Sequence, residues 1–356
     1  MRVLSVDGGG IRGIIPARIL VEIEHRTGRS CAELFDFMVG TSTGGILTLG
    51  LTAPGPSGAP RYSASDLLTI YAGRGSEIFP GGGKPTWQQR IFGPLGARGL
   101  FKKENYLGPA QRLGAIAGGN PRYAGNARYF PDGLERVLAE FFGDTQLGEA
   151  LRPVVVVSYD VKSSSPVFFD SRDTSAGGAA SLLMRDIARA TSAGPTFFPP
   201  KRLVMNGREL ILVDGGVAAN NPAMVGYANA LQASGSAGDV ILVSLGTGTS
   251  PASRPADVTL ESISSRNWLK VASGVMGMVF DGTSDAQDQM LRGLLDSPGA
   301  APHYWRLQTE VQGCNVAMDD ASSENIACLG QAAERLIEQK HAEIEAVCAS
   351  LDVPRR

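Results

Sequence analysis

Ser42 stands between two glycines in the stretch Gly40-Thr41-Ser42-Thr43-Gly44, and this spacing could carry covalent chemistry. The pattern G-x-S-x-G is typical of a sharp strand-to-helix turn that exposes the serine Oγ, with glycines where neighbouring backbone approaches closely. The apolar stretch FDFMV precedes it and the small-residue stretch GGILTL follows it, as a strand and a buried helix would. This context predicts that Ser42 is a nucleophile, although a chain with 45 glycines also matches the pattern by chance.

A serine nucleophile needs a base, and the three histidines of this chain do not lie where a base is expected. Catalytic groups of open α/β sheets collect where strands end. His25 instead falls near the end of a predicted helix, His303 precedes a predicted strand, and His341 lies within a predicted helix among Glu and Lys. We therefore expect surface or capping roles for these histidines, and a Ser-His-Asp triad has little support.

Asp214 is the stronger candidate for the base, because it ends the apolar stretch LILV and is followed by Gly215 and Gly216, where backbone can come close. A carboxylate is a weak base at its reference pKa near 4. Burial beside an apolar strand would raise that pKa toward a useful value. Asp-Gly-Gly is also a common turn sequence, so the alternative is a turn without a chemical role.

The stretch DGGGIRG, residues 7–13, follows the apolar run RVLSV and offers a series of backbone N–H donors. G-x-G-x-x-G after a strand is typical of a dinucleotide site, which also needs an acidic residue at the end of the second strand. Here the second strand ends in the serine turn, and the nearest acid, Asp36, lies at the start of that strand. The dinucleotide interpretation is therefore weakened, although a nucleotide-binding sensor stays open as an alternative.

Donors at a helix N-terminus suit any localised negative charge, including the oxyanion that forms when a serine attacks an ester. The N–H groups of Gly8, Gly9 and Gly10 would supply such donors. Arg12 either adds positive potential beside that anion or holds the loop in place. The loop that ends at Gly13 is therefore a candidate oxyanion hole.

Composition argues against several classes of function. With 33 Lys and Arg against 35 Asp and Glu the net charge is −2, and a nucleic-acid partner is not expected because phosphate neutralisation needs clustered basic residues. Cys31, Cys314, Cys328 and Cys348 have no metal-ligand spacing, so we expect no metal and interpret them as buried or idle thiols of a reducing compartment. The chain begins directly on a predicted strand, and its apolar runs are shorter than the roughly 18 residues of a membrane span. We therefore expect a cytoplasmic protein.

Strands and helices alternate along the chain, which predicts an α/β fold, a three-layer α/β/α sandwich around a mainly parallel sheet. No break in composition divides it, so residues 1–356 are expected to form a single domain. A Gly/Pro-rich insertion over 53–126 is either a lid or a decoration, and the C-terminal part, 251–356, is helical over 323–350. Strands are predicted at 2–6, 34–40, 152–161, 165–171, 208–213, 239–248 and 304–308, and helices at 16–28, 41–51, 65–72, 132–143, 181–193 and 222–232.

Three of these stretches, in this order, resemble the motifs of the patatin-like phospholipase family. They are DGGGIRG at 7–13, GTSTGG at 40–45 and DGG at 214–216. Further matches are TSAGPTFFPP at 191–200, NNP at 220–222 and SLGTG at 244–248, so the resemblance covers residues 2 to about 250.

The resemblance implies a lipid acyl hydrolase that works through a Ser–Asp dyad and an acyl-enzyme intermediate, without a cofactor or metal. Ser42 would be the nucleophile and Asp214 the proton acceptor. The oxyanion hole would comprise Gly8, Gly9, Gly10 and Arg12, and the remaining motif positions are Gly13, Gly40, Gly44, Gly215 and Gly216.

The resemblance also suggests partners. The expected partner is a phospholipid membrane, bound peripherally at its inner surface, and a homo-oligomer is a further hypothesis. Some bacterial members of the family are antiviral effectors that cyclic nucleotides switch on, so a cyclic nucleotide activator is a hypothesis for this chain too. The apolar stretch NWLKVASGVMGMVF, residues 267–280, is interpreted as the lining of an acyl channel or a bilayer contact, with a plain core helix as the alternative.

Three other functions are weighed against this one. A carboxylesterase acting on soluble esters would use the same dyad, and a nucleotide-binding sensor would use the glycine loop alone. A lipid-binding protein with a vestigial site is disfavoured because Ser42 and Asp214 are both present.

Overall fold

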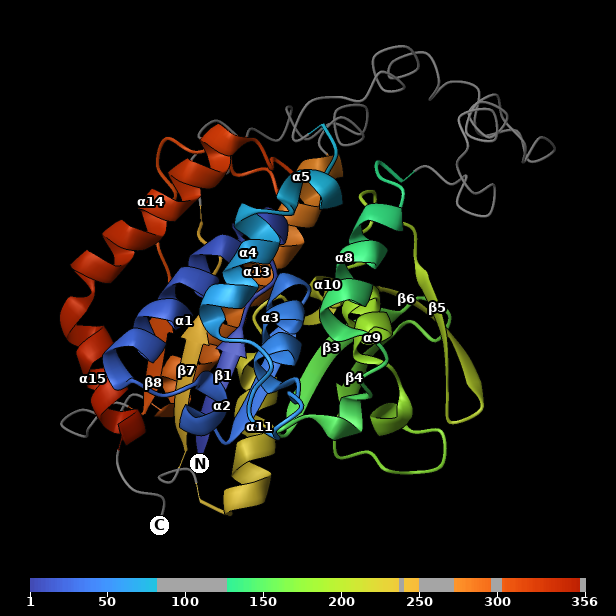
Figure 1. Ribbon diagram of the computed structural model, residues 1–356, viewed down its shortest axis with the longest axis horizontal. Helices are drawn as coiled ribbons and strands as arrows, with labels where there is room; N and C mark the ends of the chain where they lie inside the picture. The colour runs from blue at the N-terminus through green and yellow to red at the C-terminus, as the bar shows by residue number, and fades with distance from the viewer. Residues whose placement is uncertain (82–126, 237–239, 250–271, 296–302, 353–356) are drawn as a thin grey trace.

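The computed structural model describes residues 1–81, 127–236, 240–249, 272–295 and 303–352 (Figure 1). Its centre is an eight-stranded sheet in the order β5-β6-β3-β2-β1-β7-β8, with β4 also paired to β3. The strands are β1 (Arg2–Val6), β2 (Phe37–Thr41), β3 (Val154–Asp160), β4 (Ser165–Asp170), β5 (Lys201–Met205), β6 (Arg208–Asp214), β7 (Ile241–Leu245) and β8 (Tyr304–Leu307).

Five neighbouring strands, β3-β2-β1-β7-β8, run parallel to one another. The other three, β4, β5 and β6, pair in the antiparallel sense. All residues of β1 and β2 are buried, as expected for parallel strands that are covered on both faces. The prediction of a mainly parallel sheet is confirmed.

Helices cover both faces of the sheet, so the predicted three-layer α/β/α sandwich is confirmed (Figure 1). Side chains alternate between the faces: in β1, Leu4 packs into one apolar layer and Val3 into the other, and in β3, Val156 and Val155 divide in the same way. One layer holds α1 (Ile14–Thr27), α2 (Cys31–Leu34), α3 (Thr43–Thr52), α4 (Ala64–Ala72), α5 (Gly75–Ile78), α8 (Asp132–Phe142), α9 (Met184–Thr191), α14 (Ser323–Gln339) and α15 (His341–Asp352), and the other α10 (Gly216–Ala219), α11 (Ala223–Ser234) and α13 (Ala272–Leu295).

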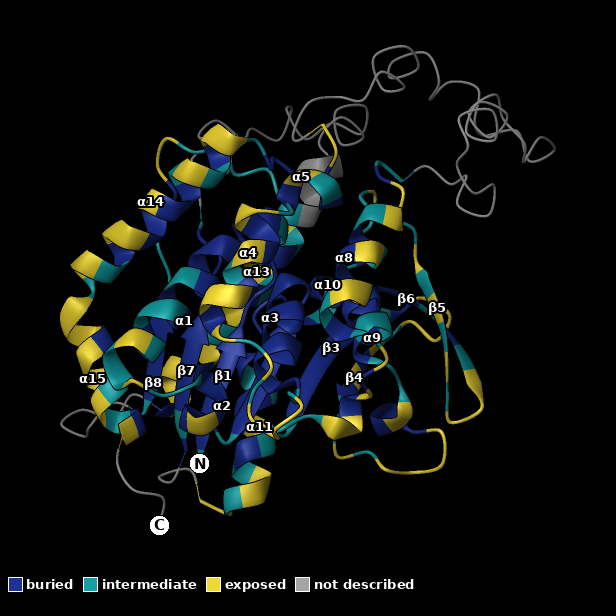
Figure 2. Ribbon diagram, in the orientation of Figure 1, coloured by how far each residue is buried: buried dark blue, intermediate teal, exposed yellow. Residues whose placement is uncertain are grey.

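The helix α3, which follows the serine turn, is buried along its whole length (Figure 2). Its interior position requires that polar side chains find partners inside the helix. Thr48 Oγ1 donates to the carbonyl oxygen of Gly44 at 3.0 Å, and Thr52 Oγ1 donates to that of Thr48 at 2.8 Å. Its small residues, and its threonine hydroxyls that donate to carbonyl oxygens of the same helix, therefore allow α3 to pack directly on the sheet.

Two predicted boundaries need correction. The second strand begins at Phe37 rather than at residue 34, because Ser30 and Glu33 form a capping box that starts the short helix α2. The helical stretch 323–350 is two helices separated at Lys340, so His341 begins a helix instead of lying inside one. In the insertion 53–126, interpreted as a lid or a decoration, the predicted helix is α4, and residues 82–126 lie outside the described residues.

Two of the four cysteines are bonded to each other, so their interpretation as idle thiols is wrong. Cys314 and Cys328 form a disulfide, with Cα atoms 5.6 Å apart. The loop before α14 folds back onto that helix, where the Asn315 N–H donates to Asn325 Oδ1 at 2.9 Å, and this contact has no spacing motif in the sequence. The other two cysteines are free. Within the described ranges, no helix is both long and apolar enough to cross a bilayer.

Candidate active site

The serine turn and the aspartate meet because two strands run toward each other along one edge of β3. Thr41, the last residue of β2, pairs with Val157, and Asp214, the last residue of β6, pairs with Ser158. The strand β4 pairs with the same residues of β3 from its other edge, so β2 and β6 share one edge. The carboxyl ends of β2 and β6 therefore face each other, which brings Ser42 beside Asp214.

Ser42 occupies the tight turn between β2 and α3 with φ 54° and ψ −122°, a conformation that residues other than glycine rarely adopt. The surrounding backbone is packed closely. A Cβ on Gly40 would lie 2.3 Å from the carbonyl oxygen of Gly44, and a Cβ on Gly44 would lie 2.0 Å from that of Val6. Close packing of the turn thus explains both glycines of the G-x-S-x-G pattern.

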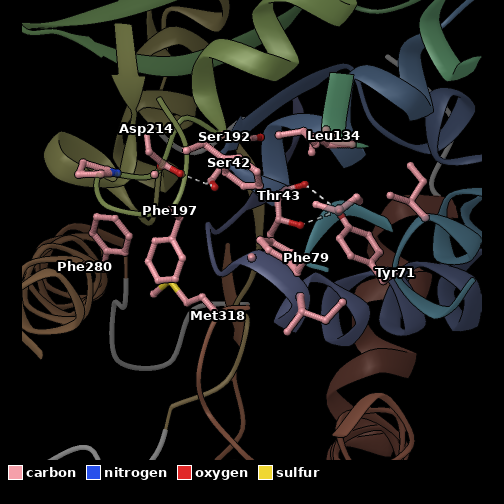
Figure 3. Close-up of a pocket in the computed structure, with 18 residues that line it drawn as sticks. Ser42, Thr43, Tyr71, Phe79, Leu134, Ser192, Phe197, Asp214, Phe280 and Met318 are labelled. Atoms are coloured by element: carbon pink, nitrogen blue, oxygen red, sulfur yellow. Dashed lines mark hydrogen bonds between the residues drawn. The ribbon is translucent and has the colours of Figure 1, made fainter. Parts of the chain in front are cut away.

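Ser42 and Asp214 are joined by a direct hydrogen bond (Figure 3). Ser42 Oγ donates to Asp214 Oδ2 at 2.6 Å, and the backbone N–H of Gly216 donates to Asp214 Oδ1 at 2.8 Å. Burial raises the pKa of Asp214 to about 6, and the two hydrogen bonds oppose that rise. Gly215 packs against the carbonyl oxygen of Val157, which lets the aspartate turn approach β3. The carboxylate is therefore fixed on both oxygens and is more basic than an ordinary aspartate.

Thr191, the last residue of α9, holds the serine turn through hydrogen bonds and was not predicted as a site residue. Its Oγ1 accepts the N–H of Ser42 at 2.8 Å and donates to the carbonyl oxygen of Val157 at 2.5 Å. The residue is fully buried, so both hydrogen bonds are made inside the core. Its membership in the stretch TSAGPTFFPP was the available signal in the sequence.

The three histidines, all of which fall within the described residues, lie away from this dyad. His25 is exposed on α1, and His303 directly precedes β8. His341 contacts Arg26 at 3.0 Å and Glu345 at 3.1 Å. None of them lines the cavity at Ser42, so Asp214 is the titratable group in contact with the serine hydroxyl.

The glycine loop between β1 and α1 packs against the serine turn, and its N–H groups are not equivalent. A Cβ on Gly8 would lie 3.1 Å from the Cβ of Ser42. The N–H of Gly8 donates to the carbonyl oxygen of Asn220 at 3.0 Å, so this donor is already used. In the part of the chain that the structure describes, no acceptor takes the N–H of Gly9 or Gly10. Gly10 lines the cavity and has φ +58°, a conformation that favours glycine.

Arg12 is buried behind the loop, and its donors are directed at backbone. Its Nη1 donates to the carbonyl oxygen of Gly248 at 2.9 Å, and its Nε contacts that of Gly9 at 3.5 Å. Arg12 does not line the cavity. Gly13, at the end of the loop, packs against Thr43 in the serine turn. Of the two interpretations of Arg12, the structure favours the one in which it holds the loop in place.

An apolar cavity opens beside Ser42 and Asp214 (Figure 3). Among its polar lining groups, Thr43 Oγ1 and Tyr71 Oη are hydrogen-bonded to each other at 2.5 Å. Phe280 of α13 belongs to the stretch 267–280 and lines this cavity, whereas residues 267–271 lie outside the described residues. The apolar lining also includes Ile46, Ile70, Phe79, Phe197, Phe198 and Met318.

Comparisons with known proteins show what this chain is similar to. The family model described as patatin-like phospholipase matches residues 4–227. Patatin-like protein 2 of Oryza sativa subsp. indica is 30% identical over 372 residues, which cover 96% of this chain and 85% of that protein. Patatin-2-Kuras 3 of Solanum tuberosum is 31% identical over 364 residues, covering 95% and 83%. The crystal structure of VipD from Legionella pneumophila aligns with a TM-score of 0.42 and 14% identity, covering 95% of this chain and 66% of that one.

Proposed function

The chain belongs to the patatin-like phospholipase family and is a lipid acyl hydrolase, and we propose that it cleaves fatty-acyl esters of membrane phospholipids through a Ser42–Asp214 dyad. The observation that carries the proposal is the 2.6 Å hydrogen bond from Ser42 Oγ to Asp214 Oδ2 at the wall of an apolar cavity. A nucleophile in contact with its base is the arrangement that acyl transfer through a covalent intermediate requires.

In the first half of the reaction, Asp214 accepts the Ser42 proton while Oγ attacks the ester carbonyl carbon. The tetrahedral intermediate collapses as Asp214 returns that proton to the departing alcohol oxygen, which leaves a fatty-acyl ester on Ser42. In the second half, Asp214 accepts a proton from water, and the resulting hydroxide attacks the acyl carbon. Collapse releases the fatty acid, and the proton on Asp214 returns to Ser42 Oγ.

The negative charge on the former carbonyl oxygen needs donors that are already in place. The N–H groups of Gly9 and Gly10 are the two of the predicted loop that have no acceptor within the described residues, whereas that of Gly8 is used by Asn220. We therefore assign the oxyanion hole to Gly9 and Gly10, with Arg12 holding the loop through Gly9 and Gly248. Loss of one such donor typically lowers the rate by about 100- to 1,000-fold.

The pKa of Asp214 supports its role as the base. With a pKa of about 6, the carboxylate is mostly ionised at neutral pH and still more basic than a solvent-exposed aspartate. Proton-transfer catalysis is most effective when the pKa of the base lies near the working pH. Burial of Asp214 thus gives the site a base with a raised pKa, which is the property that a histidine provides in a triad.

The apolar lining of the cavity favours a long acyl chain over a small soluble ester. Aromatic side chains that include Phe79 after α5, Phe198 after α9 and Phe280 on α13 line the space next to Ser42. An acyl chain held there would be removed from water, which is favourable in proportion to its buried area. A short-chain carboxylesterase would not need this lining.

Membrane association and regulation are further predictions about this enzyme. We expect peripheral contact with the inner membrane surface, and activation by a cyclic nucleotide in antiviral defence and a homo-oligomer are further hypotheses. Fatty-acid release from vesicles would be measured with and without cyclic di- and trinucleotides, together with the mass of the particle in solution. Unchanged activity and mass would contradict the activation hypothesis.

Fatty-acid release from phosphatidylcholine vesicles tests the proposal. Ser42→Ala and Asp214→Asn are expected to fall to background while they stay folded. Ser323→Ala and Asp144→Asn change the same residue types at exposed positions and are expected to keep full activity. Full activity in either dyad variant would overturn the assignment, and activity on a soluble butyrate ester without activity on vesicles would favour the carboxylesterase.

A further inference from the structure

A buried ion pair joins Asp7, the first residue of the glycine loop, to Arg306 on β8, which lies far from it in the sequence. Arg306 on β8 donates from Nη1 to Asp7 Oδ1 at 2.9 Å and from Nη2 to Asp7 Oδ2 at 2.5 Å. Its Nη1 also donates to Ser244 Oγ on β7 at 2.9 Å. Arg306 stands 299 residues from Asp7 in the sequence and outside the range that the family model matches.

Both partners of this pair are removed from solvent. The Arg306 side chain is 6% exposed and the Asp7 side chain 2%. Burial alone would lower the pKa of Arg306, but the charge and hydrogen bonds of Asp7 outweigh burial and raise it, so the guanidinium is charged. A planar guanidinium that binds both oxygens of a carboxylate fixes the orientation of that carboxylate as well as its position.

Asp7 is the residue through which this orientation reaches the glycine loop. Its N–H donates to the carbonyl oxygen of Leu245 at 3.0 Å, which continues the pairing of β1 with β7. The next N–H, of Gly8, is held by Asn220, and the two N–H groups assigned to the oxyanion hole follow immediately. Asp7 is therefore held by one backbone hydrogen bond and by hydrogen bonds to both oxygens of its side chain. These contacts set the direction in which the chain leaves β1.

The far side of the loop is anchored separately. The N–H of Ile11 donates to the carbonyl oxygen of Met318 at 2.8 Å, and Arg12 donates to Gly248. Gly9 and Gly10 therefore span two fixed ends, one at Asp7 and one at Ile11. A change at either end would alter where their N–H groups point.

We propose that Arg306 is a positioning residue for the oxyanion hole: by clamping Asp7, it holds the N–H groups of Gly9 and Gly10 where the carbonyl oxygen of the substrate becomes negative. This inference rests on the proposed function, since it assumes that these two N–H groups serve Ser42. It also gives a catalytic reason for β8 and its position in the sheet next to β7. An ion pair that only stabilises the fold is the alternative, and the two make different kinetic predictions.

Arg306→Lys is the first test, because it keeps the positive charge and loses the bidentate contact with the Asp7 carboxylate. With p-nitrophenyl butyrate as substrate, we expect kcat to fall by about 10- to 100-fold, as displaced catalytic groups do, while KM stays within about twofold. The rate at which a fluorophosphonate modifies Ser42 is expected to fall in parallel, because that reaction also places a negative oxygen in the hole. Arg172→Lys, at the opposite end of the sheet beside Phe37, is the matched control and should leave kcat unchanged.

The outcomes separate the two roles. A folded Arg306→Lys variant with a lower Tm but an unchanged kcat would overturn the proposal, and so would a raised KM with an unchanged kcat. If Arg306→Lys does not fold, the double variant Asp7→Asn with Arg306→Gln, which leaves no unpaired buried charge, is measured instead. The same loss of kcat is expected there, and wild-type kcat would overturn the proposal. Failure of the proposed function would look different, as persistent activity in Ser42→Ala.

Discussion

Asp214 accepts the hydroxyl hydrogen of Ser42 at 2.6 Å although 172 residues separate the two in the sequence. The contact arises because β2 and β6 end against consecutive residues of β3, so the turns that follow them face each other. A serine and a carboxylate that are joined in this way need no third side chain to orient the base, since the backbone N–H of Gly216 already fixes the second oxygen.

The activity should report the titration of Asp214. Its pKa is raised to about 6 by burial, so the base is ionised above that pH and protonated below it. We expect kcat/KM for p-nitrophenyl butyrate to fall about tenfold for each pH unit below about 6 and to level off above it. A profile that is flat between pH 5 and 8 would contradict a role for this carboxylate as the base.

Thr191→Val should weaken the serine turn. The substitution removes the hydroxyl that accepts the Ser42 N–H and donates to Val157, and it leaves two buried backbone groups unpaired. We expect a loss of about 1–3 kcal/mol in the free energy of unfolding for each unpaired group, and a lower kcat at temperatures where the variant is folded. Thr191→Ser keeps the hydroxyl and should retain most of the activity. Equal kcat in the valine and serine variants would show that the hydroxyl does not matter.

The disulfide should stabilise the wall of the cavity. The loop that it closes contains Met318, which lines the cavity and whose carbonyl oxygen accepts the Ile11 N–H. Replacing Cys314 and Cys328 together by serine is expected to lower the free energy of unfolding by about 3 kcal/mol, the amount associated with a closed loop of this length. Cys348→Ser is the control. If a reducing agent does not change the Tm of the wild type, the bond does not form in solution.

Phe280→Ala should separate long from short substrates. Phe280 is buried against the cavity, whereas Met278, two residues earlier on α13, is 47% exposed. We expect kcat/KM for p-nitrophenyl dodecanoate to fall about tenfold, equivalent to ~1.4 kcal/mol of lost acyl contact, with butyrate hydrolysis nearly unchanged. Met278→Ala should leave both rates unchanged. Parallel losses for both esters, with a lower Tm, would indicate a plain core position instead.

Much of the fold and the dyad could be predicted from the sequence because their signals are local. Apolar strands, small-residue helices and glycines at sites of close backbone approach leave a pattern within a few residues, as around Ser42 and Asp214. The boundary of β2 was missed because residues 31–34 form the short helix α2, which begins at a capping box between Ser30 and Glu33.

The supports of the site were less accessible because they depend on contacts between distant segments. Thr191 reaches Ser42 across 149 residues, and Arg306 reaches Asp7 across 299. Thr191 begins the stretch TSAGPTFFPP, which does not itself assign it a contact, and Arg306 lies outside the matched range. A buried arginine is indistinguishable in sequence from a surface arginine until its carboxylate partner is placed. The Cys314–Cys328 bond spans only 14 residues, and it was missed because no spacing motif in the sequence shows that the loop folds back onto α14.

The most direct test of the account is to identify the residue that carries the acyl group. The wild type and the Ser42→Ala and Asp214→Asn variants would be incubated with a fluorophosphonate that forms a stable analogue of the acyl-enzyme, and the modified peptide located by tandem mass spectrometry. The account predicts one adduct per chain, on Ser42, absent in Ser42→Ala and formed much more slowly in Asp214→Asn. A stoichiometric adduct on any other residue, or wild-type labelling of Asp214→Asn, would contradict it.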